Sequence, residues 1–329
     1  MPTRVRFAPS PTGSLHLGSA LSAVANRRLG DWFLLRIDDT DSARNVPGGE
    51  EELVRDLEWL GIAWDEGPIR QSDRRERQLE AAHTLGDRFD GITLVREDGT
   101  PTYHLASVVD DVDFAITHVV RGFDHRPNEA LHRRLHEALG SVPPEYVHHG
   151  LVLGPDGKKL SKRRHGVATI ADVREQGIPP EAVRAYLEEL GLPRHDVHLD
   201  LARLRRLAID AIESLPDEEL AARAGAPVEL ARALRGARDL VEAQEMARAI
   251  LEPADVELPD SARPTLVRFA ELRASGLDGK EIVRELKAVG GDLKSLRLAL
   301  TGAPSGPELW AVIAALSQEE ALRRVSRFV

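Results

Sequence analysis

The pattern of apolar and polar positions in the N-terminal part of the chain predicts strands that alternate with helices. Apolar and charged side chains alternate over residues 4–7, which indicates a short strand, and helical spacing follows over residues 19–29. Residues 32–37 form a nearly continuous apolar run, as in a strand that is buried on both faces. An amphipathic helix at residues 50–60 and a third short strand at residues 62–64 come next. This alternation predicts a parallel α/β sheet, whose ligands bind beyond the carboxyl ends of the strands.

The strand pattern ends about halfway along the chain and gives way to helices. Further strands are predicted at residues 92–95, 118–122 and 146–149, so the sheet is expected to reach about residue 150. From about residue 180 to the end, apolar residues recur only at helical spacing. The predicted fold class is therefore α/β, with a Rossmann-like parallel-sheet domain followed by all-α helical modules.

One segment joins the first strand to the first helix through a turn rich in proline and glycine. It runs from Arg6 to Ser19 and reads Arg-Phe-Ala-Pro-Ser-Pro-Thr-Gly-Ser-Leu-His-Leu-Gly-Ser. A helix N-terminus offers unpaired N–H groups and a positive dipole end to anions, and Gly18 lets a nucleotide approach the backbone closely. His16 adds a hydrogen-bond donor at the same place. The segment is therefore either a phosphate site or a plain turn between a strand and a helix.

Two charged clusters follow strands of the predicted sheet. Asp38, Asp39 and Asp41 come directly after the second strand, either as a site for a cation or an amine or as a solvated helix cap. Residues 158–164 read Lys-Lys-Leu-Ser-Lys-Arg-Arg and follow a hairpin turn. Such a loop is either solvated basic surface or a mobile set of donors for the charge that develops on a phosphate.

Composition and charge exclude several classes of protein. The 329 residues include no cysteine, which excludes disulfides and thiolate zinc sites. Of the 12 histidines, His118, His148 and His149 lie in apolar, strand-like surroundings without ligand spacing, and no zinc is expected. No apolar run approaches the ~20 residues of a membrane span, and the first residues do not resemble a signal peptide. We therefore expect a cytoplasmic protein without a membrane partner. The net charge of −10 argues against general electrostatic capture of nucleic acid, although a local basic face is still compatible with it.

Four motifs resemble, in this order, those of the glutamyl-tRNA synthetases of class I. They lie at residues 8–13 with 16–19, 36–41, 118–122 and 159–163. Residues 16–19 look like the HIGH element of that family, and residues 159–163 look like its KMSKS loop. Residues 215–220, 296–302 and 306–309 look like parts of its helical tRNA-binding region, so the resemblance covers most of the chain.

The resemblance implies a two-step reaction and a division of the chain. An amino-acid carboxylate attacks the α-phosphate of ATP and releases pyrophosphate, and the adenylate then acylates the terminal ribose of tRNA. Mg²⁺ accompanies the ATP, and no protein nucleophile is needed. The resemblance places the class I catalytic domain at residues 1–165, a stem-contact-like helical region at 166–245 and a C-terminal, anticodon-binding-like module at 246–329. A monomer is expected.

The resemblance also implies roles for individual residues. The catalytic residues would be His16, Lys159 and Lys162, the two lysines neutralising charge on the pyrophosphate. The ATP-binding residues would be Pro11, Thr12, Gly13, His16, Gly18, Ser19, Lys159, Leu160, Ser161 and Lys162. The amino-acid-binding residues would be Arg6, Ala8, Ser10, Asp38, Tyr103, Ser107, Arg121 and Phe123. Arg6 and Arg121 would bind substrate carboxylates.

Three residues of the predicted amino-acid pocket depart from the family's pattern. Asp38 stands where glutamate is usual, which shortens by one methylene the carboxylate expected to meet the substrate amine. Ser107 stands in place of an asparagine, and Phe123 in place of an acidic residue. A polar group left unpaired in a pocket costs ~1–3 kcal/mol. The pocket has therefore either repacked around glutamate or holds another substrate.

The chain is also shorter than most members of the family that it resembles. Family members carry a much longer insertion in place of residues 72–100, often with a zinc-binding cysteine cluster, and this insertion meets the tRNA acceptor end. Val-Pro-Gly at residues 46–48 and the early Gly18-Ser19 look closer to the glutamyl-queuosine tRNA(Asp) synthetases, short paralogues without anticodon-binding modules. Because this chain keeps some helical modules, it matches neither type fully.

Three functions follow from these observations. The first is ATP-dependent activation of glutamate and its transfer to tRNA. The second is the same adenylation chemistry with a different amino acid, or with transfer of glutamate to another acceptor such as a modified tRNA base. The third is a catalytically silent protein that only binds RNA, against which the intact His16, Lys159 and Lys162 argue. The expected partners are glutamate or a related amino acid, ATP with Mg²⁺, and tRNA.

Overall fold

The computed structural model describes residues 2–329, and its contacts divide the chain into two compact units. The first consists of Met1–Glu175 with Val183–Leu201, and the second of Gln176–Ala182 with Ala202–Val329. Each unit is described by itself below. The three-part division at residues 165 and 245 stays a prediction.

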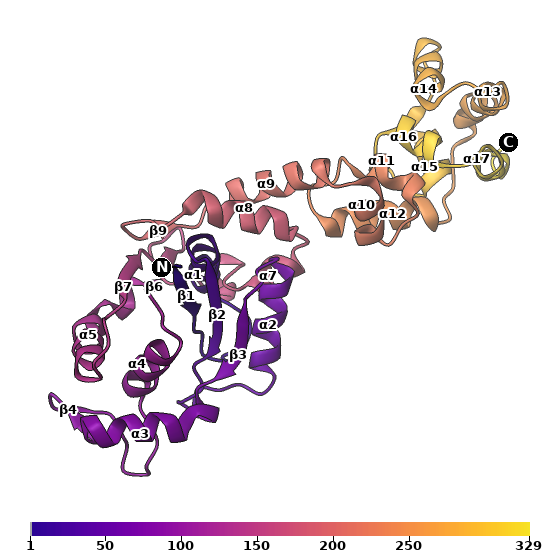
Figure 1. Ribbon diagram of the computed structural model, residues 1–329. Helices are drawn as coiled ribbons and strands as arrows, with labels where there is room; N and C mark the ends of the chain where they lie inside the picture. The colour runs from indigo at the N-terminus through magenta and orange to yellow at the C-terminus, as the bar shows by residue number, and fades with distance from the viewer. Residues whose placement is uncertain (1) are drawn as a thin grey trace. The chain divides into compact units, whose positions relative to one another are not determined.

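A five-stranded parallel sheet forms the centre of the first unit (Figure 1). Its strands are β1 (Arg4–Phe7), β2 (Trp32–Ile37), β3 (Glu66–Arg70), β6 (His118–Gly122) and β7 (Glu145–His149). They lie in the order β3-β2-β1-β6-β7, and every pair is parallel. This confirms the predicted α/β fold. The order changes direction between β1 and β6, and ligands of such sheets bind at that point, beyond the carboxyl ends of the strands.

The central strands are predictable from the sequence because they are buried on both faces. Residues 33–35 and Ile37 of β2 are fully buried, and β2 pairs with β1 from Arg4↔Trp32 to Phe7↔Leu35. The strand predicted at residues 62–64 is wrong, since the third strand lies at Glu66–Arg70. That strand is at the edge of the sheet and is mostly exposed, and it contains Pro68, which an edge strand tolerates. It therefore lacks the apolar pattern that would have marked it.

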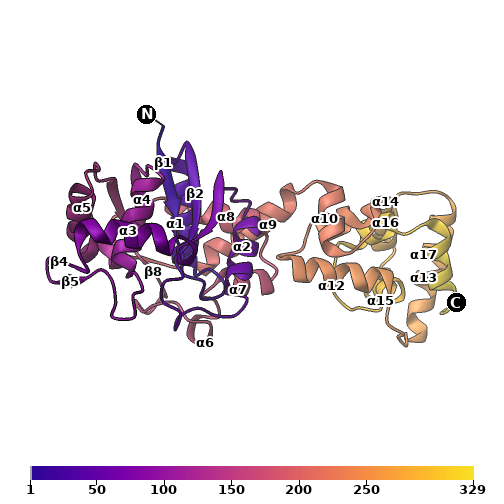
Figure 2. The same ribbon diagram turned by 60° about the horizontal axis from the view of Figure 1, so that its bottom comes forward.

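Helices cover the sheet and build a second layer beside it. The longer helices of this unit are α1 (Leu17–Leu29), α2 (Gly49–Trp59), α3 (Arg75–Leu85), α4 (Tyr103–Asp113) and α5 (Glu129–Ala138). Helix α1 packs on β1 and β6, whereas α3 packs on α4 and α4 on α5 (Figures 1 and 2). Their shared core includes Leu94, Leu105, Val109 and Leu135, all fully buried. Helix α4 thus presents its residues to the carboxyl side of β1 and β2.

Short elements complete the first unit and its boundary. They are the 3₁₀ turns Ser72–Arg74 and Phe123–Asn128, the hairpin β4 (Arg88–Phe89) and β5 (Ile92–Thr93), the parallel pair β8 (Val152–Leu153) and β9 (Val197–His198), and helices α6 (Lys162–His165), α7 (Ile170–Glu175) and α8 (Pro180–Leu190). The strand predicted at residues 92–95 is therefore shorter than expected, and β9 interrupts the region that was predicted to be helical only.

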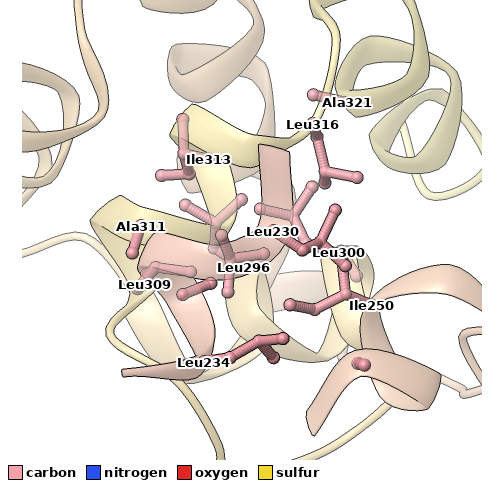
Figure 3. Packing of buried hydrophobic residues seen from close by; sticks show 14 of the residues in the cluster. Leu230, Leu234, Ile250, Leu296, Leu300, Leu309, Ala311, Ile313, Leu316 and Ala321 are labelled. Atoms are coloured by element: carbon pink, nitrogen blue, oxygen red, sulfur yellow. The ribbon is translucent and has the colours of Figure 1, made fainter. Parts of the chain in front are cut away.

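Residues 202–329, all described by the structure, contain helices and no strand. The helices are α9 (Leu201–Ser214), α10 (Asp217–Ala224), α11 (Ala231–Leu234), α12 (Leu240–Leu251), α13 (Arg263–Ala274), α14 (Gly279–Ala288), α15 (Leu293–Thr301), α16 (Leu309–Ala315) and α17 (Gln318–Ser326), with 3₁₀ turns at Val228–Leu230 and Asp260–Ala262. Leucine and isoleucine side chains from helices α9 to α16 meet in one core, part of which is labelled in Figure 3. Helical modules after the sheet domain were predicted, and this is confirmed. Across residues 2–329, no helix has the length and apolar character needed to cross a bilayer.

Candidate active site at the carboxyl edge of the sheet

The turn that follows β1 is held against the start of α2. The N–H of Val46 donates to the carbonyl oxygen of Pro11 at 3.0 Å. A Cβ atom on Gly49, the first residue of α2, would lie only 2.5 Å from that same oxygen, so no larger residue fits there. Gly13 has φ +99°, a left-handed conformation that favours glycine. The Val-Pro-Gly segment noted in the sequence therefore shapes the turn that contains Pro11, Thr12 and Gly13.

The start of α1 is bound to the segment that follows the basic loop. The N–H of Leu17 donates to the carbonyl of Ala168, and that of Ile170 donates to the carbonyl of Leu15. His16 lies between them and pairs with Thr169 across an antiparallel bridge. The start of α1 is thus joined through the backbone to a segment about 150 residues further along the chain. No sequence motif marked residues 168–170 as the connection.

A buried carboxylate on α2 fixes the same region, and the sequence interpretation missed it. One oxygen of Asp56, Oδ2, accepts from Ser14 Oγ at 2.6 Å and from the N–H of Leu15 at 2.9 Å. Its other oxygen lies 3.4 Å from a guanidinium nitrogen of Arg174. Burial raises the pKa of Asp56, and the hydrogen bond from Ser14 opposes that rise. An aspartate on the apolar stripe of the predicted helix, between Leu53 and Leu57, was the signal that could have revealed it.

The first turn of α1 has the features of a phosphate site. The leading N–H groups of a helix have no partner within the helix, and they point towards an anion placed at its start. Gly18 has open space where a Cβ atom would be, and His16 is exposed at the N-cap. Residues 11–19 therefore bring Gly18, Ser19 and His16 together at one helix end, a place that a phosphate of ATP would fit.

The basic loop has one lysine engaged by neighbouring carboxylates. Lys162 Nζ lies 2.7 Å from Glu175 Oε2 and 2.9 Å from Asp172 Oδ1, and both carboxylates belong to α7. The hydrogen bond with Glu175, followed by that with Asp172, raises the pKa of Lys162. Lys159 is exposed, and its backbone pairs with Leu153. The loop can therefore present the ammonium groups of both Lys159 and Lys162 to a phosphate only after Lys162 separates from the carboxylates of α7.

His165 holds the loop from within. Its Nδ1 accepts from the N–H of Ser161 at 3.1 Å, and its Nε2 lies 3.0 Å from Asp156 Oδ1. The ring packs on Gly154, where a Cβ atom would lie 2.4 Å from Nε2. Ser161 is thus held by a histidine that was not among the predicted site residues.

Asp38 does not present a free carboxylate, because Arg36 binds both of its oxygens. The Nε atom of Arg36 donates to Asp38 Oδ1 at 2.7 Å, and a terminal nitrogen donates to Oδ2 at 3.2 Å. Arg36 is fully buried and also lies 3.0 Å from Asp111 Oδ1. Burial raises the pKa of Asp38, and Arg36 only partly offsets this. The amine contact expected of Asp38 would therefore require this ion pair to rearrange.

Helix α4 supplies the remaining groups around Arg36. Ser107 accepts from Arg36 through both its carbonyl and its Oγ, each at 3.4 Å. Asp111 also binds Arg6, whose Nε lies 3.3 Å from Oδ1. Burial alone would raise the pKa of Asp111, but Arg6 and Arg36 outweigh it and lower that pKa. Arg6, Asp38 and Ser107 therefore do come together, but Arg36 and Asp111 lie between them.

Replacing Arg36 is expected to destabilise the first unit strongly. Arg36→Met would leave the carboxylates of Asp38, Asp110 and Asp111 buried beside one another without their shared cation. Breaking a buried ion pair by removing one partner costs about 3–5 kcal/mol in the free energy of unfolding. Urea-induced unfolding measures this. Arg70→Met, which removes an exposed ion pair with Glu50, is the matched control and should leave the free energy of unfolding nearly unchanged.

Arg121, at the end of β6, is a buried cation with unused donors. The residue is 6% exposed, and within residues 2–329 both of its terminal nitrogens are buried without a hydrogen-bond partner. Its guanidinium lies over the ring of Tyr146, 5.0 Å from the centroid. Burial lowers the pKa of Arg121, although Tyr103 opposes this. Two parallel N–H donors on a buried guanidinium match the two oxygens of a carboxylate.

Aromatic and imidazole rings surround Arg121. Tyr103 lies 5.6 Å from the ring of His132 and 6.3 Å from that of His125, measured between centroids. Phe123 stacks on His148 at 6.4 Å. Phe123 is thus connected to Arg121 through His148, and Tyr103 lies near enough to act on the charge of Arg121, while the histidines were missed. For His132 and His136 the signal in the sequence was their spacing of four, which places both on one face of helix α5.

These histidines are held neutral, which makes stability depend on pH. Burial lowers the pKa of His132 well below its usual value, and it also lowers the pKa of His104, His136 and His149. The unfolded chain therefore binds more protons below about pH 6.5, so the free energy of unfolding should fall as the pH drops towards 5. Urea unfolding at a series of pH values measures the slope. His132→Gln should make it shallower by up to about 1.4 kcal/mol per pH unit, and an unchanged slope would contradict the assignment.

Known proteins resemble this chain in sequence and in fold. A family model described as the catalytic domain of class I tRNA synthetases (E and Q) matches residues 2–88 and 86–203. Glutamate–tRNA ligase 1 of Rubrobacter xylanophilus is 34% identical, over 98% of this chain and 97% of the relative. Glutamate–tRNA ligase of Akkermansia muciniphila is 31% identical, over 99% and 98%. Both relatives align with this chain over nearly the full length of each sequence.

A solved structure has the same fold. The crystal structure of a glutamate tRNA ligase from Elizabethkingia meningosepticum, in complex with its amino acid, superposes with a TM-score of 0.75 at 23% identity, over 99% of both chains. The alignment with the Rubrobacter relative spans 421 positions, more than the 329 residues of this chain, so that relative has residues that this chain lacks. The family match divides at residues 86–88, inside the segment 72–100.

Proposed function

This chain belongs to the class I tRNA synthetases of the glutamate and glutamine family, and from that premise we propose that it activates glutamate with ATP and transfers it to tRNA. The observation that supports glutamate most directly is Arg121, a buried cation near Tyr103 whose two terminal nitrogens have no hydrogen-bond partner among residues 2–329. A carboxylate side chain would satisfy both donors with charge-assisted hydrogen bonds. An amide side chain offers one oxygen and two N–H groups, so it would leave part of the guanidinium unpaired.

The proposed chemistry needs positioning and charge stabilisation rather than a protein nucleophile. The α-carboxylate of the amino acid attacks the α-phosphorus of ATP, and the bond to the β-phosphate breaks with release of pyrophosphate. His16 with the N–H groups of Gly18 and Ser19 would hold the phosphates at the start of α1. Lys159 and Lys162 would neutralise the leaving pyrophosphate, and Mg²⁺ would enter with ATP. The terminal ribose hydroxyl of tRNA then takes the aminoacyl group and releases AMP.

The residues proposed for the amino acid need one rearrangement. Arg6 is paired with Asp111 through its Nε, and Asp38 with Arg36, whereas both terminal nitrogens of Arg121 are buried without a hydrogen-bond partner among residues 2–329. Ala8 and Ser10 follow β1 directly and lie at the carboxyl edge of the sheet next to this cluster. Binding of the substrate amine would therefore have to draw Asp38 away from Arg36.

A second candidate function follows from that same ion pair. If Asp38 stays bound to Arg36 and Ser107, the amine of glutamate has no carboxylate partner, which favours adenylation of a different amino acid or transfer to another acceptor, such as a modified tRNA base. The likeness of Val46-Pro47-Gly48 to the glutamyl-queuosine tRNA(Asp) synthetases belongs to this candidate. ATP and tRNA are substrates found in the cytoplasm, and a cytoplasmic location is part of either proposal.

Charging of RNA tests the proposed function. The full chain with ATP, Mg²⁺, radiolabelled glutamate and total tRNA should yield acid-precipitable label that mild alkali releases, because an aminoacyl ester is base-labile. A stable label on RNA would instead support transfer to a modified base. RNA binding without label or ATP consumption would support the catalytically silent alternative and would contradict the proposal.

A further inference from the structure

His148, on β7, accepts a hydrogen bond from Arg121. The Nε of Arg121 donates to Nε2 of His148, and the two atoms are 3.2 Å apart. Because an arginine Nε always has its hydrogen, Nε2 of His148 must be the unprotonated nitrogen of a neutral ring. The ring proton of His148 therefore sits on Nδ1. This contact joins the carboxyl ends of two adjacent strands, which pair at Arg121↔His148.

The other side of the imidazole faces a carboxylate. Nδ1 of His148 lies 3.5 Å from Oε2 of Glu129, the first residue of α5. The other oxygen of Glu129 is held by Arg133, with a donor distance of 2.7 Å. A carboxylate on the Nδ1 side favours a proton on that nitrogen and so leaves Nε2 free to accept. Arg121 is thus held by His148 through a hydrogen bond, and Glu129 lies on the opposite side of the imidazole.

Aromatic packing holds the imidazole in this orientation. Phe123 stacks on one side of His148, and Tyr146 lies on another, each with a centroid distance of 6.4 Å and a small interplanar angle. The side chain of His148 is 7% exposed. The charged and titratable groups around it are Arg121, Glu129, Arg126, His125 and Tyr146. Phe123, which departs from the family's pattern, therefore supports the histidine that binds Arg121.

We propose that His148 is a positioning residue for amino-acid recognition: its neutral ring holds Nε of Arg121, so that the two terminal nitrogens are free to bind the substrate carboxylate. This inference rests on the proposed function, in which Arg121 is the carboxylate ligand. Within the described residues, the guanidinium has no other hydrogen-bond partner, so loss of His148 would leave it held only by packing on Tyr146. A protonated His148 would donate from both nitrogens and would repel Arg121.

The ring is kept neutral by its surroundings, which links recognition to pH. Burial and then the charge of Arg121 lower the pKa of His148, while Glu129 raises it. Protonation should therefore begin only below the ordinary histidine value of about 6.5. At that point the Michaelis constant for the amino acid should rise, and the one for ATP should not.

Kinetics on three variants separate positioning from packing. His148→Ala should raise KM for glutamate by about 10-fold to 100-fold, with KM for ATP unchanged. In His148→Gln the amide oxygen can accept from Arg121, so KM at about pH 8 should stay within a few-fold of the wild type. In the wild type, KM for glutamate should rise as the pH falls towards about 6, in part because His148 becomes protonated. His148→Gln should lack that part of the rise, because glutamine does not titrate. The control His118→Ala removes a histidine from the opposite end of strand β6 and should leave both KM values unchanged.

A measurement that needs no activity tests the same inference. Nitrogen NMR of histidine-labelled full-length protein, with His148 assigned through His148→Gln, should show the Nδ1–H tautomer at about pH 8. In Arg121→Met the titration midpoint of His148 should move upward, because a neighbouring positive charge is gone. An Nε2–H tautomer, or an unmoved midpoint, would overturn the inference. So would a His148→Ala variant with wild-type KM.

Failure of the proposed function and failure of the inference about His148 would give different results in these experiments. If the wild-type chain activates no amino acid, the tautomer and the titration still decide the state of His148. If glutamate is activated and the tautomer is the expected one, equal KM values in His148→Ala and His148→Gln would reduce the residue to a packing role and would also overturn the inference.

Discussion

Arg121→Met is expected to raise KM for glutamate by about 100-fold to 1,000-fold in ATP–pyrophosphate exchange, with KM for ATP unchanged. The substitution keeps most of the apolar contact with Tyr146 but removes two buried donors that have no other partner in the described structure. Each hydrogen bond to a charged group contributes about 1.5–3 kcal/mol. Arg121→Lys should recover only part of the loss, since an ammonium cannot bind both carboxylate oxygens in one plane.

Arg126→Met is the matched control for Arg121. Arg126 is exposed, lies 6.0 Å over the ring of Phe123 and belongs to the same turn after β6. Its replacement should leave KM for glutamate within a few-fold of the wild type. Equal effects of the two substitutions would mean that general positive charge, rather than the paired donors of Arg121, attracts the substrate.

Lys162→Ala is expected to lower kcat of adenylate formation by about 100-fold to 1,000-fold, with little change in KM for glutamate. An ammonium aimed at the leaving pyrophosphate acts mainly in the transition state, where negative charge develops. Pre-steady-state measurement of pyrophosphate release gives this rate directly. A drop confined to KM for ATP would instead mean that Lys162 only binds the nucleotide in its ground state.

Two further variants serve as controls for Lys162→Ala. Lys158→Ala removes an exposed ammonium four residues earlier in the same loop and should leave kcat nearly unchanged. Glu175→Gln weakens the contact that holds Lys162 on α7, so it should not lower kcat and should ease movement of the loop. If Glu175→Gln reduced kcat as strongly as Lys162→Ala, the ion pair itself would be the active arrangement.

The central strands of the sheet were predictable because a run of apolar residues within the strand itself marks a buried strand. The apolar run at residues 32–37 leaves no other place for β2 than the interior of a parallel sheet. The edge strand β3 was misplaced because an exposed strand has no such run. The Arg36–Asp38 pair was also within reach, because residues two apart in a strand point to the same face. A basic and an acidic side chain on one buried face would be expected to pair.

The remaining contacts of the site were not predictable, because they join distant parts of the chain. Asp111 meets Arg6 and Arg36 only through the packing of α4 against the ends of β1 and β2. Asp56 meets Ser14 through the position of α2, and His148 meets Arg121 through the register of β6 and β7. The motifs identified residues that follow strands. The side chains that hold those residues in place belong to elements without a motif.

ATP–pyrophosphate exchange with glutamate, glutamine and aspartate, each with and without total tRNA, tests most directly that this site activates an amino acid with a carboxylate side chain. Exchange with glutamate is expected to exceed exchange with glutamine by about 100-fold or more, since glutamine leaves buried donors of Arg121 unpaired. Exchange with glutamine equal to that with glutamate, or no exchange with any of the three in the presence of tRNA, would contradict it.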